Sequence, residues 1–339
     1  MTVTLVIRRP VGVLVGLAAA ALLLSACGSG PNQVGSALIV GNTSVSVNQV
    51  QKELNGLLAS SPTVQQAQKQ GKLDQATAGI VTNHVLHDLV GRSATENQLV
   101  VTDQQVDQLI SQSGGAAKLA PALEVDQANV RTTVKDVLLE VALARKFADS
   151  LSVNFGYVVA TSRADATAKA QQLAANPNGL AAMVAAANKT AQAQGAQSGG
   201  QTTATFSVSS YLQGVEQAQQ QAQSQGTAAP TENDGPVFGT PVNTVVAFEP
   251  DPASSGTWIV ALIKSRTINT STVPLGASPA DNADLSTLEQ IGISLLQPDA
   301  KSLGVRVSPR YGVWDQVGME VVPSTAQPTG LEIPVAHKS

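Results

Sequence analysis

The sequence contains a single cysteine, Cys27, among its 339 residues. The chain therefore has no second thiol with which to close a disulfide, and it lacks the paired cysteines of zinc ribbons and thioredoxin-like redox motifs. Aromatic residues make up only 3% of the chain. A hydrophobic core in this protein must therefore be built mainly from Ala, Val, Leu and Ile.

Charged residues are also scarce, at 13% of the chain, and they balance to a net charge of −4 at pH 7. Lys and Arg are scattered and form no basic stripe, which argues against a nucleic-acid partner. The sequence has no G-x-S-x-G elbow, P-loop, G-x-G-x-x-G turn or H-E-x-x-H helix, so four large enzyme classes have no motif to support them. We predict no catalytic residue, no cofactor and no bound metal.

Two histidines, His84 and His87, lie three positions apart on a predicted helix, where their side chains are neighbours. A metal site would need a third ligand, and Asp88 is the only nearby candidate in the sequence. We therefore interpret the pair as part of a solvated helix face.

The amino terminus has the features of a secretory signal. Arg8 and Arg9 form a short positive region, and residues 11–24 are almost entirely apolar. That apolar run is shorter than the roughly 18–20 residues that a permanent membrane-spanning helix needs. The segment "LSAC" (residues 24–27) resembles the bacterial lipobox. The resemblance implies cleavage just before Cys27 and a diacylglycerol on its thiol.

Residues 1–26 are accordingly predicted to be a lipoprotein signal peptide, and residues 27–35 a flexible tether of small and polar residues. A lone cysteine at this position fits its use by lipid, because a free thiol is a liability in an oxidising compartment. The predicted location is the outer face of the cell membrane. The alternative is an ordinary secretory signal in which Cys27 occurs by chance.

Residues 36–150 are predicted to be mainly helical. Ser46 and Gln49 have the spacing of a capping box, and so do Thr102 and Gln105. Apolar residues at helical spacing follow each of these starts. The predicted elements are a strand over residues 37–41 and four amphipathic helices that begin at Ser46, Leu73, Thr102 and Asp126.

The remainder of the chain mixes strands with helices. Residues 189–235 are nearly free of charge and rich in Gln, Ala, Gly, Ser and Thr, so we predict a mobile insertion with one helix near residues 209–224. Residues 323–339 are predicted to be a disordered tail. The other predicted elements are a strand over 152–160, helices over 163–175 and 178–188, two strand segments within 236–267, a helix over 281–303 that Pro298 interrupts, and a strand over 305–315.

The segment "ALIVGNTSVSVNQVQKEL" (residues 37–54) resembles the opening of the SurA/PrsA family of extracytoplasmic foldases, in which a strand leads into a capped helix. The closing "VRVSPRYGVWD" resembles the end of SurA-like lipoproteins of actinobacteria. The resemblance implies an α+β fold. A mainly helical SurA-like chaperone module, residues 36–150, would be completed by a C-terminal helix and strand, residues 281–316, and joined to a small parvulin-like α/β module, residues 151–268.

Parvulin isomerases carry one histidine in their first strand and another in their last. The corresponding positions of this chain hold Gly156 and Trp258, and the family's "GGdLG" turn is echoed only by "SGGQTTATF", which lacks its acidic residue. The resemblance therefore implies a degenerate parvulin-like module that serves as a binding or spacer unit. Weak isomerase activity stays open, because twisting an X–Pro bond requires no covalent step.

The function implied is that of a lipid-anchored chaperone which binds extended apolar segments of unfolded or newly exported proteins. The alternatives are a parvulin-type peptidyl-prolyl isomerase and an envelope adaptor with one dedicated protein partner. The membrane would be contacted through the diacylglycerol on Cys27. Helix-face residues are the candidates for client binding, although the same spacing also fits core positions: Val50, Leu54, Leu138 and Val141.

Overall fold

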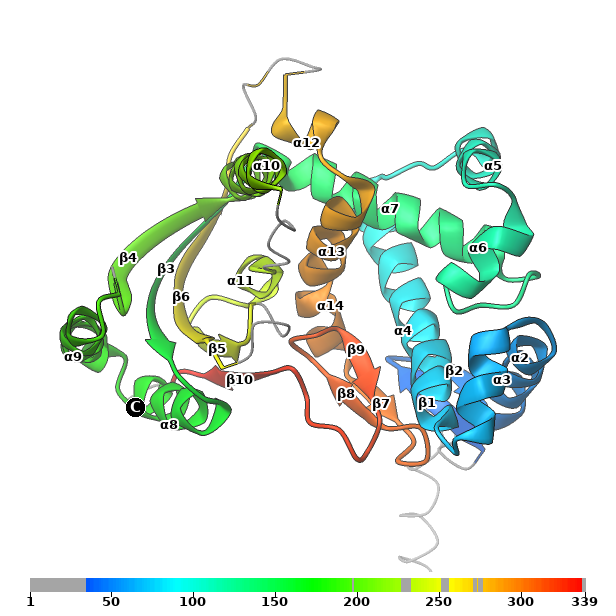
Figure 1. Ribbon diagram of the computed structural model, residues 1–339, viewed down its shortest axis with the longest axis horizontal. Helices are drawn as coiled ribbons and strands as arrows, with labels where there is room; N and C mark the ends of the chain where they lie inside the picture. The colour runs from blue at the N-terminus through cyan, green and yellow to red at the C-terminus, as the bar shows by residue number, and fades with distance from the viewer. Residues whose placement is uncertain are drawn as a thin grey trace, which may run out of the picture.

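The computed structural model describes residues 35–196, 198–226, 233–250, 256–270, 273 and 277–336. The signal peptide, Cys27 and nearly all of the tether lie outside these residues. Figure 1 shows a helical part beside a strongly curved sheet, with the C-terminal helices between them. Among the described helices, none combines the length and the apolar character needed to cross a bilayer.

The helical part begins with a β-hairpin whose second strand leads directly into a helix. The hairpin turn at Gly41 has a positive φ, which glycine adopts without strain. Six helices follow, and the two longest, α4 and α7, pack against each other. The elements of this part are β1 (Ser36–Val40), β2 (Thr43–Ser46), α2 (Val47–Ser60), α3 (Pro62–Lys69), α4 (Leu73–Asn97), α5 (Asp103–Gln112), α6 (Ala116–Ala122) and α7 (Val130–Ala148).

The sheet part is a five-stranded antiparallel sheet in the order β10-β5-β6-β3-β4, with helices α8 and α9 on one face. Its long central pair, β3 and β6, runs from Leu151 opposite Ile268 to Ala160 opposite Trp258. The elements are β3 (Leu151–Ala160), α8 (Arg163–Ala175), the 3-10 turn η1 (Pro177–Gly179), α9 (Leu180–Ala193), β4 (Gly200–Ser207), α10 (Val208–Gln225), α11 (Gly235–Gly239), β5 (Thr244–Phe248) and β6 (Trp258–Ile268).

The C-terminal segment returns to both parts. β7 pairs with β1 in the helical part, α13 packs along α7, and β10 becomes an edge strand of the large sheet. The elements are α12 (Pro279–Asn282), α13 (Leu285–Leu295), α14 (Gln297–Leu303), β7 (Val305–Val307), β8 (Val313–Asp315), β9 (Glu320–Val322) and β10 (Gly330–Pro334). The chain therefore has the α+β fold that the resemblance implied.

Two buried clusters show why the C-terminal segment matters for packing. In the first, Leu296 and Met319 pack among residues of β1, α2 and α4. In the second, Leu288 and Ile291 of α13 join Val141 of α7 to the concave side of the sheet. The C-terminal helices therefore contribute side chains to the cores of both parts.

Two segments that were predicted to lack regular structure are strands. Residues 200–207, inside the expected mobile insertion, form β4, and Val208–Gln225 form the helix expected near its end. The tail prediction is wrong for Gly330–Pro334, which pair with β5 from Gly330 opposite Phe248 to Pro334 opposite Thr244. Pro334 is tolerated because it ends a strand at the sheet edge, where a missing N–H costs little.

The capping boxes and the helix break predicted from the sequence are confirmed only in part. Thr102 and Gln105 form the full capping box. At the other predicted box, Ser46 Oγ accepts the N–H of Gln49, but the Gln49 side chain donates to Glu53 instead of reaching back. The predicted helix over 281–303 is interrupted at residues 283–284 and again at Leu296, and Pro298 lies in the first turn of α14.

Candidate functional site

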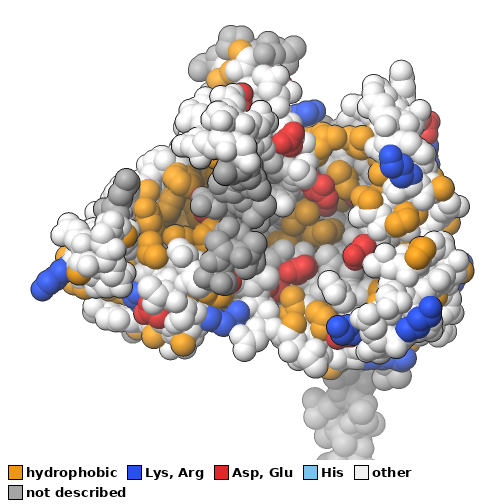
Figure 2. Space-filling view, in the orientation of Figure 1, with side chains coloured by type: hydrophobic (Ala, Val, Ile, Leu, Met, Phe, Trp, Pro, Cys, Tyr) orange, Lys and Arg blue, Asp and Glu red, His pale blue; other side chains and the backbone are white. Residues whose placement is uncertain are grey.

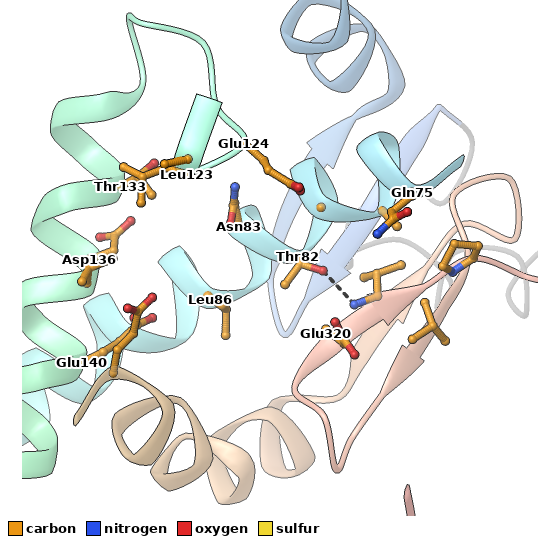
Figure 3. Close-up of a pocket in the computed structure, with 18 of the residues that line it drawn as sticks. Gln75, Thr82, Asn83, Leu86, Leu123, Glu124, Thr133, Asp136, Glu140 and Glu320 are labelled. Carbon is orange, nitrogen blue, oxygen red and sulfur yellow. Dashed lines mark hydrogen bonds between the residues drawn. The ribbon is translucent and has the colours of Figure 1, made fainter. Parts of the chain in front are cut away.

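A cleft of about 650 Å³ opens between α4, α7, α13 and β9, and we refer to it as the acidic cleft. Figure 3 shows its walls, and Figure 2 shows Asp and Glu side chains around a hollow on the same side of the molecule. Residues at helical spacing on α4 and α7 form two opposite walls. Residues that line the cleft include Gln75, Thr82, Asn83 and Leu86 of α4, Asp136, Val137 and Glu140 of α7, Glu124, Glu289 of α13, and Glu320, Val321 and Val322 of β9.

β9 forms the third wall, and one hydrogen bond holds it to a distant part of the chain. The backbone N–H of Val321 donates to Thr82 Oγ1 at 2.7 Å, which fixes β9 against α4. The fourth wall, α13, is held by its close approach to α7. The cleft therefore exists only when the C-terminal segment is packed on the helical part.

The cleft is lined by five carboxyl groups, those of Glu124, Asp136, Glu140, Glu289 and Glu320, and none of its described lining residues is Lys or Arg. Glu140 is only 2% exposed, and no hydrogen bond or ion pair to its carboxyl group forms within the described residues. Figure 3 shows Asp136 and Glu140 projecting from α7 into the space. An unpaired carboxylate in such a place is costly, because burial disfavours its charged form.

The pKa values in the cleft reflect this cost. Burial raises the pKa of Glu140 well above its ordinary value, and the nearby carboxyls of Glu289 and Asp136 raise it further. Burial likewise raises the pKa of Glu289. At Glu320 burial raises the pKa first, and Asp315 adds to it. The cleft is thus a site where several carboxyl groups lack a counter-charge.

A smaller hollow of about 240 Å³ adjoins the acidic cleft and contains the two histidines. His84 Nε2 lies 3.0 Å from both carboxylate oxygens of Glu53, and its side chain is 19% exposed. His87 Nδ1 lies 2.8 Å from Asp136 Oδ2, and this hydrogen bond raises the pKa of His87. The predicted solvated face is therefore wrong for His84, which packs on Glu53 of α2. Among the described residues, no group of three or more His, Cys, Asp or Glu could hold a metal ion.

The residues predicted from the helix faces do not meet at this site. Val50 and Leu54 are buried in the core of the helical part, and Val141 is buried against the sheet part. Leu138 is half-buried in a third group around α5 and α6. Because these three side chains are buried, a client segment has no access to them in this conformation. The prediction selected them because apolar periodicity identifies residues that face a core. Their role in client binding stays a prediction without structural support.

A sequence signal for the cleft did exist. Asp136 and Glu140 are four residues apart and share a helix face with Val137 and Val141, which belong to the apolar run of α7. Acidic side chains within such a run must either pair or line a cavity. Glu289 and Glu320 carry no comparable signal, because their positions depend on long-range packing.

Seven of the ten aromatic residues belong to the cluster on the concave side of the sheet. Phe155 and Phe206 meet edge to face with ring centroids 5.2 Å apart, and Tyr211 meets Phe238 at 5.9 Å. Tyr157 lies 6.0 Å from Phe155. Beside Phe206 and Tyr211 is a hollow of about 400 Å³. This aromatic face is mostly packed, and the hollow beside it is also lined by Thr205, Ser210 and Asp234.

The two positions at which parvulins carry histidine, Gly156 and Trp258, lie apart in this structure. A Cβ at Gly156 would lie 2.3 Å from the carbonyl oxygen of Thr202 and 2.5 Å from Leu180, so no side chain fits there. Gly156 is paired with Leu262, whereas Trp258 is paired with Ala160 four residues away. The two positions therefore do not face each other across the strand pair.

No family model matches the chain, and no curated protein matches it either. Among solved structures, a crystal structure of foldase protein PrsA from Streptococcus pneumoniae str. Canada MDR_19A is similar to it at 11% sequence identity, covering 81% of this chain and 97% of that one, with a TM-score of 0.25. A likeness at this level supports no family assignment.

The burial of Glu140 in the cleft predicts a pH-dependent effect on the stability of the protein. The folded-state pKa of Glu140 is raised, so the folded protein holds a proton there over a pH range in which the unfolded chain has lost it. Wild-type stability therefore falls as the pH rises through that range, and Glu140→Gln escapes this fall. We expect Glu140→Gln to be more stable than wild type by roughly 1–3 kcal/mol near pH 8. The difference should shrink as the pH approaches 4.5, the ordinary pKa of Glu.

Scanning calorimetry at several pH values measures this difference. Glu216→Gln on the exposed face of α10 is the matched control, and it should melt like wild type at every pH. A stability gain for Glu140→Gln that did not depend on pH would contradict the explanation by burial of the charge.

Proposed function

We propose that the chain is a lipid-anchored extracytoplasmic chaperone that binds extended segments of unfolded or newly exported proteins in the acidic cleft. The observation that carries the proposal is the cleft itself, an open space of about 650 Å³ with mixed apolar and polar walls. A space of this size accommodates a short stretch of extended chain. Anchoring through diacylglycerol on Cys27, at the outer face of the cell membrane, is proposed from the lipobox resemblance.

Binding in such a cleft would be weakly selective among the apolar side chains of a client. Apolar wall residues such as Leu86 and Val137 supply affinity by burial, at about 25 cal/mol per Å² of apolar surface, offset by the ordering of the client chain. Apolar contacts of this kind discriminate poorly between client side chains of similar size. These properties favour a holding chaperone over an adaptor with one dedicated partner.

The isomerase alternative has less support. The space at Gly156 excludes any side chain, so no histidine can stand at that position of the parvulin pattern. A dedicated partner remains the alternative in which client promiscuity would be absent.

The test is light scattering of two unrelated, chemically unfolded client proteins diluted into buffer with residues 28–339, which contain every described residue. We expect suppressed aggregation of both clients at equal molarity. No suppression with either client would contradict the proposal, and suppression of only one would favour the dedicated partner.

A cleft-blocking variant sharpens this test. Ala326 is an exposed residue at the rim of the acidic cleft, and Ala326→Trp should fill the entrance and reduce suppression several-fold. Ala193→Trp, an equally exposed position at the end of α9, is the matched control and should behave like wild type. Equal activity of the two variants would place client binding outside the cleft.

A further inference from the structure

The acidic cleft contains more carboxyl groups than the protein itself pairs with basic side chains. Asp136 is paired with His87, and Glu53 of the adjoining hollow is paired with His84. Glu140, Glu289 and Glu320 have no ion-pair partner within the described residues. Among the described residues Glu124 is also unpaired but exposed, so the unpaired carboxyl groups that are at least half-buried lie where α7, α13 and β9 meet.

Glu140 separates this arrangement from an ordinary acidic surface patch. Exposed carboxylates are solvated by water and need no partner, but Glu140 is 2% exposed and projects into the cleft. The helix that carries it is held against α13, so its backbone has little freedom to move the carboxyl group into solvent. A ligand that brings a positive charge into the cleft would offset this burial cost.

A basic side chain fits the cleft better than a metal ion as the source of this positive charge. No described group of three or more ligating residues is close enough to hold a metal. A long basic side chain can place its charged end beside Glu140 while its methylene stem contacts apolar wall residues such as Leu86 and Val137. The backbone of the segment would stay at the mouth of the cleft.

We propose that the acidic cleft selects extended segments that carry an arginine or lysine, and that the basic side chain enters the cleft to pair with Glu140 and Glu289. This inference rests on the proposed function and names its substrate class. Arginine is the better fit of the two, because its guanidinium is weakly hydrated and can contact two carboxylates at once.

The test compares two short, fluorescein-labelled extended peptides that differ at one central position. One carries arginine and the other carries citrulline, which has nearly the same shape and no charge. Fluorescence anisotropy with residues 28–339 should give a dissociation constant about 10-fold or more lower for the arginine peptide, since a charge-assisted contact is being removed. The same ratio is then measured for Glu140→Gln and for the control Glu216→Gln.

We expect the arginine-to-citrulline ratio to fall toward one in Glu140→Gln and to stay unchanged in Glu216→Gln. Because Glu140→Gln is expected to be more stable than wild type, a loss of the ratio together with an unchanged or raised melting temperature excludes misfolding as the cause. Calorimetric titration in two buffers of different ionisation enthalpy should also show proton release with the arginine peptide, because an entering cation lowers the raised pKa of Glu140.

Equal affinity for the two peptides would overturn this inference. It would also be overturned if Nα-acetyl-arginine amide alone bound as tightly as the peptide, since the cleft would then be a small-cation site. If aggregation is suppressed while the peptides bind equally, the proposed chaperone function stands and only the selectivity fails. If neither clients nor peptides bind, the proposed function itself fails.

Discussion

Replacing Gly292 by alanine is expected to lower the free energy of unfolding by about 3 kcal/mol. Gly292 lies where α13 crosses α7, and a Cβ at this position would be 2.2 Å from the carbonyl oxygen of Glu140 and 2.6 Å from its carbonyl carbon. Both are backbone atoms, which cannot rotate out of the way. The two helices must therefore separate, and the packing of Leu288 and Ile291 between them is loosened. Denaturant unfolding followed by circular dichroism measures the change.

Gly91 provides the matched control, because it is also a helix-interior glycine. Nothing lies within 4 Å of a Cβ at Gly91, so Gly91→Ala should raise stability by roughly 0.5–1 kcal/mol through its better helix propensity. Opposite signs for the two substitutions are the expected result. If Gly292→Ala unfolded at the same denaturant concentration as wild type, the close contact of α7 with α13 would not exist in solution.

The contact at Gly292 also explains why the place of Glu289 in the acidic cleft was not visible in the sequence. Glu289 precedes Gly292 by one helical turn, and it approaches Glu140 only because α13 lies so close to α7. The proximity of Glu140 and Glu289 depends on the packing of α7 on α13, and nearly the whole sheet part lies between these two helices in the sequence. A residue pattern within one helix carries no information on such a distance.

Local signals did predict much of the helical part. The capping box of Thr102 and Gln105 and the break near Pro298 are decided by residues within one turn, so they could be recognised without the fold. β4 and β10 were missed because their strand character depends on partners far away in sequence. Residues 330–334 contain only two apolar side chains at alternate positions, Leu331 and Ile333, and these are covered only once β5 is beside them.

The candidate client-binding residues failed for a related reason. Val50, Leu54 and Val141 were chosen by apolar spacing, which reports that a face is covered but not by what. In this protein the helix faces are covered by the chain itself. Glu140 was the more informative residue, because an acid within the apolar run of α7 conflicts with simple burial and marks the cleft.

Deleting residues 281–339 is expected to abolish cooperative folding of the helical part. The deletion removes β7 from β1, α13 from α7, and the Val321 N–H that donates to Thr82. It also removes Leu288, Ile291 and Leu296, each of which is fully buried. Burial of these three side chains contributes about 6 kcal/mol, which is comparable to the total stability of roughly 5–15 kcal/mol expected for a folded domain.

The truncated chain, residues 28–280, should therefore show no cooperative thermal transition and should bind a dye that reports exposed apolar surface. Deleting only residues 337–339, which follow the last described residue, is the matched control and should leave the melting temperature unchanged. A truncated chain that melted like the intact protein would mean that the helical part folds without its C-terminal completion. The acidic cleft would then lose two of its four walls without loss of the helical core, and the truncated chain would no longer distinguish the arginine peptide from the citrulline peptide.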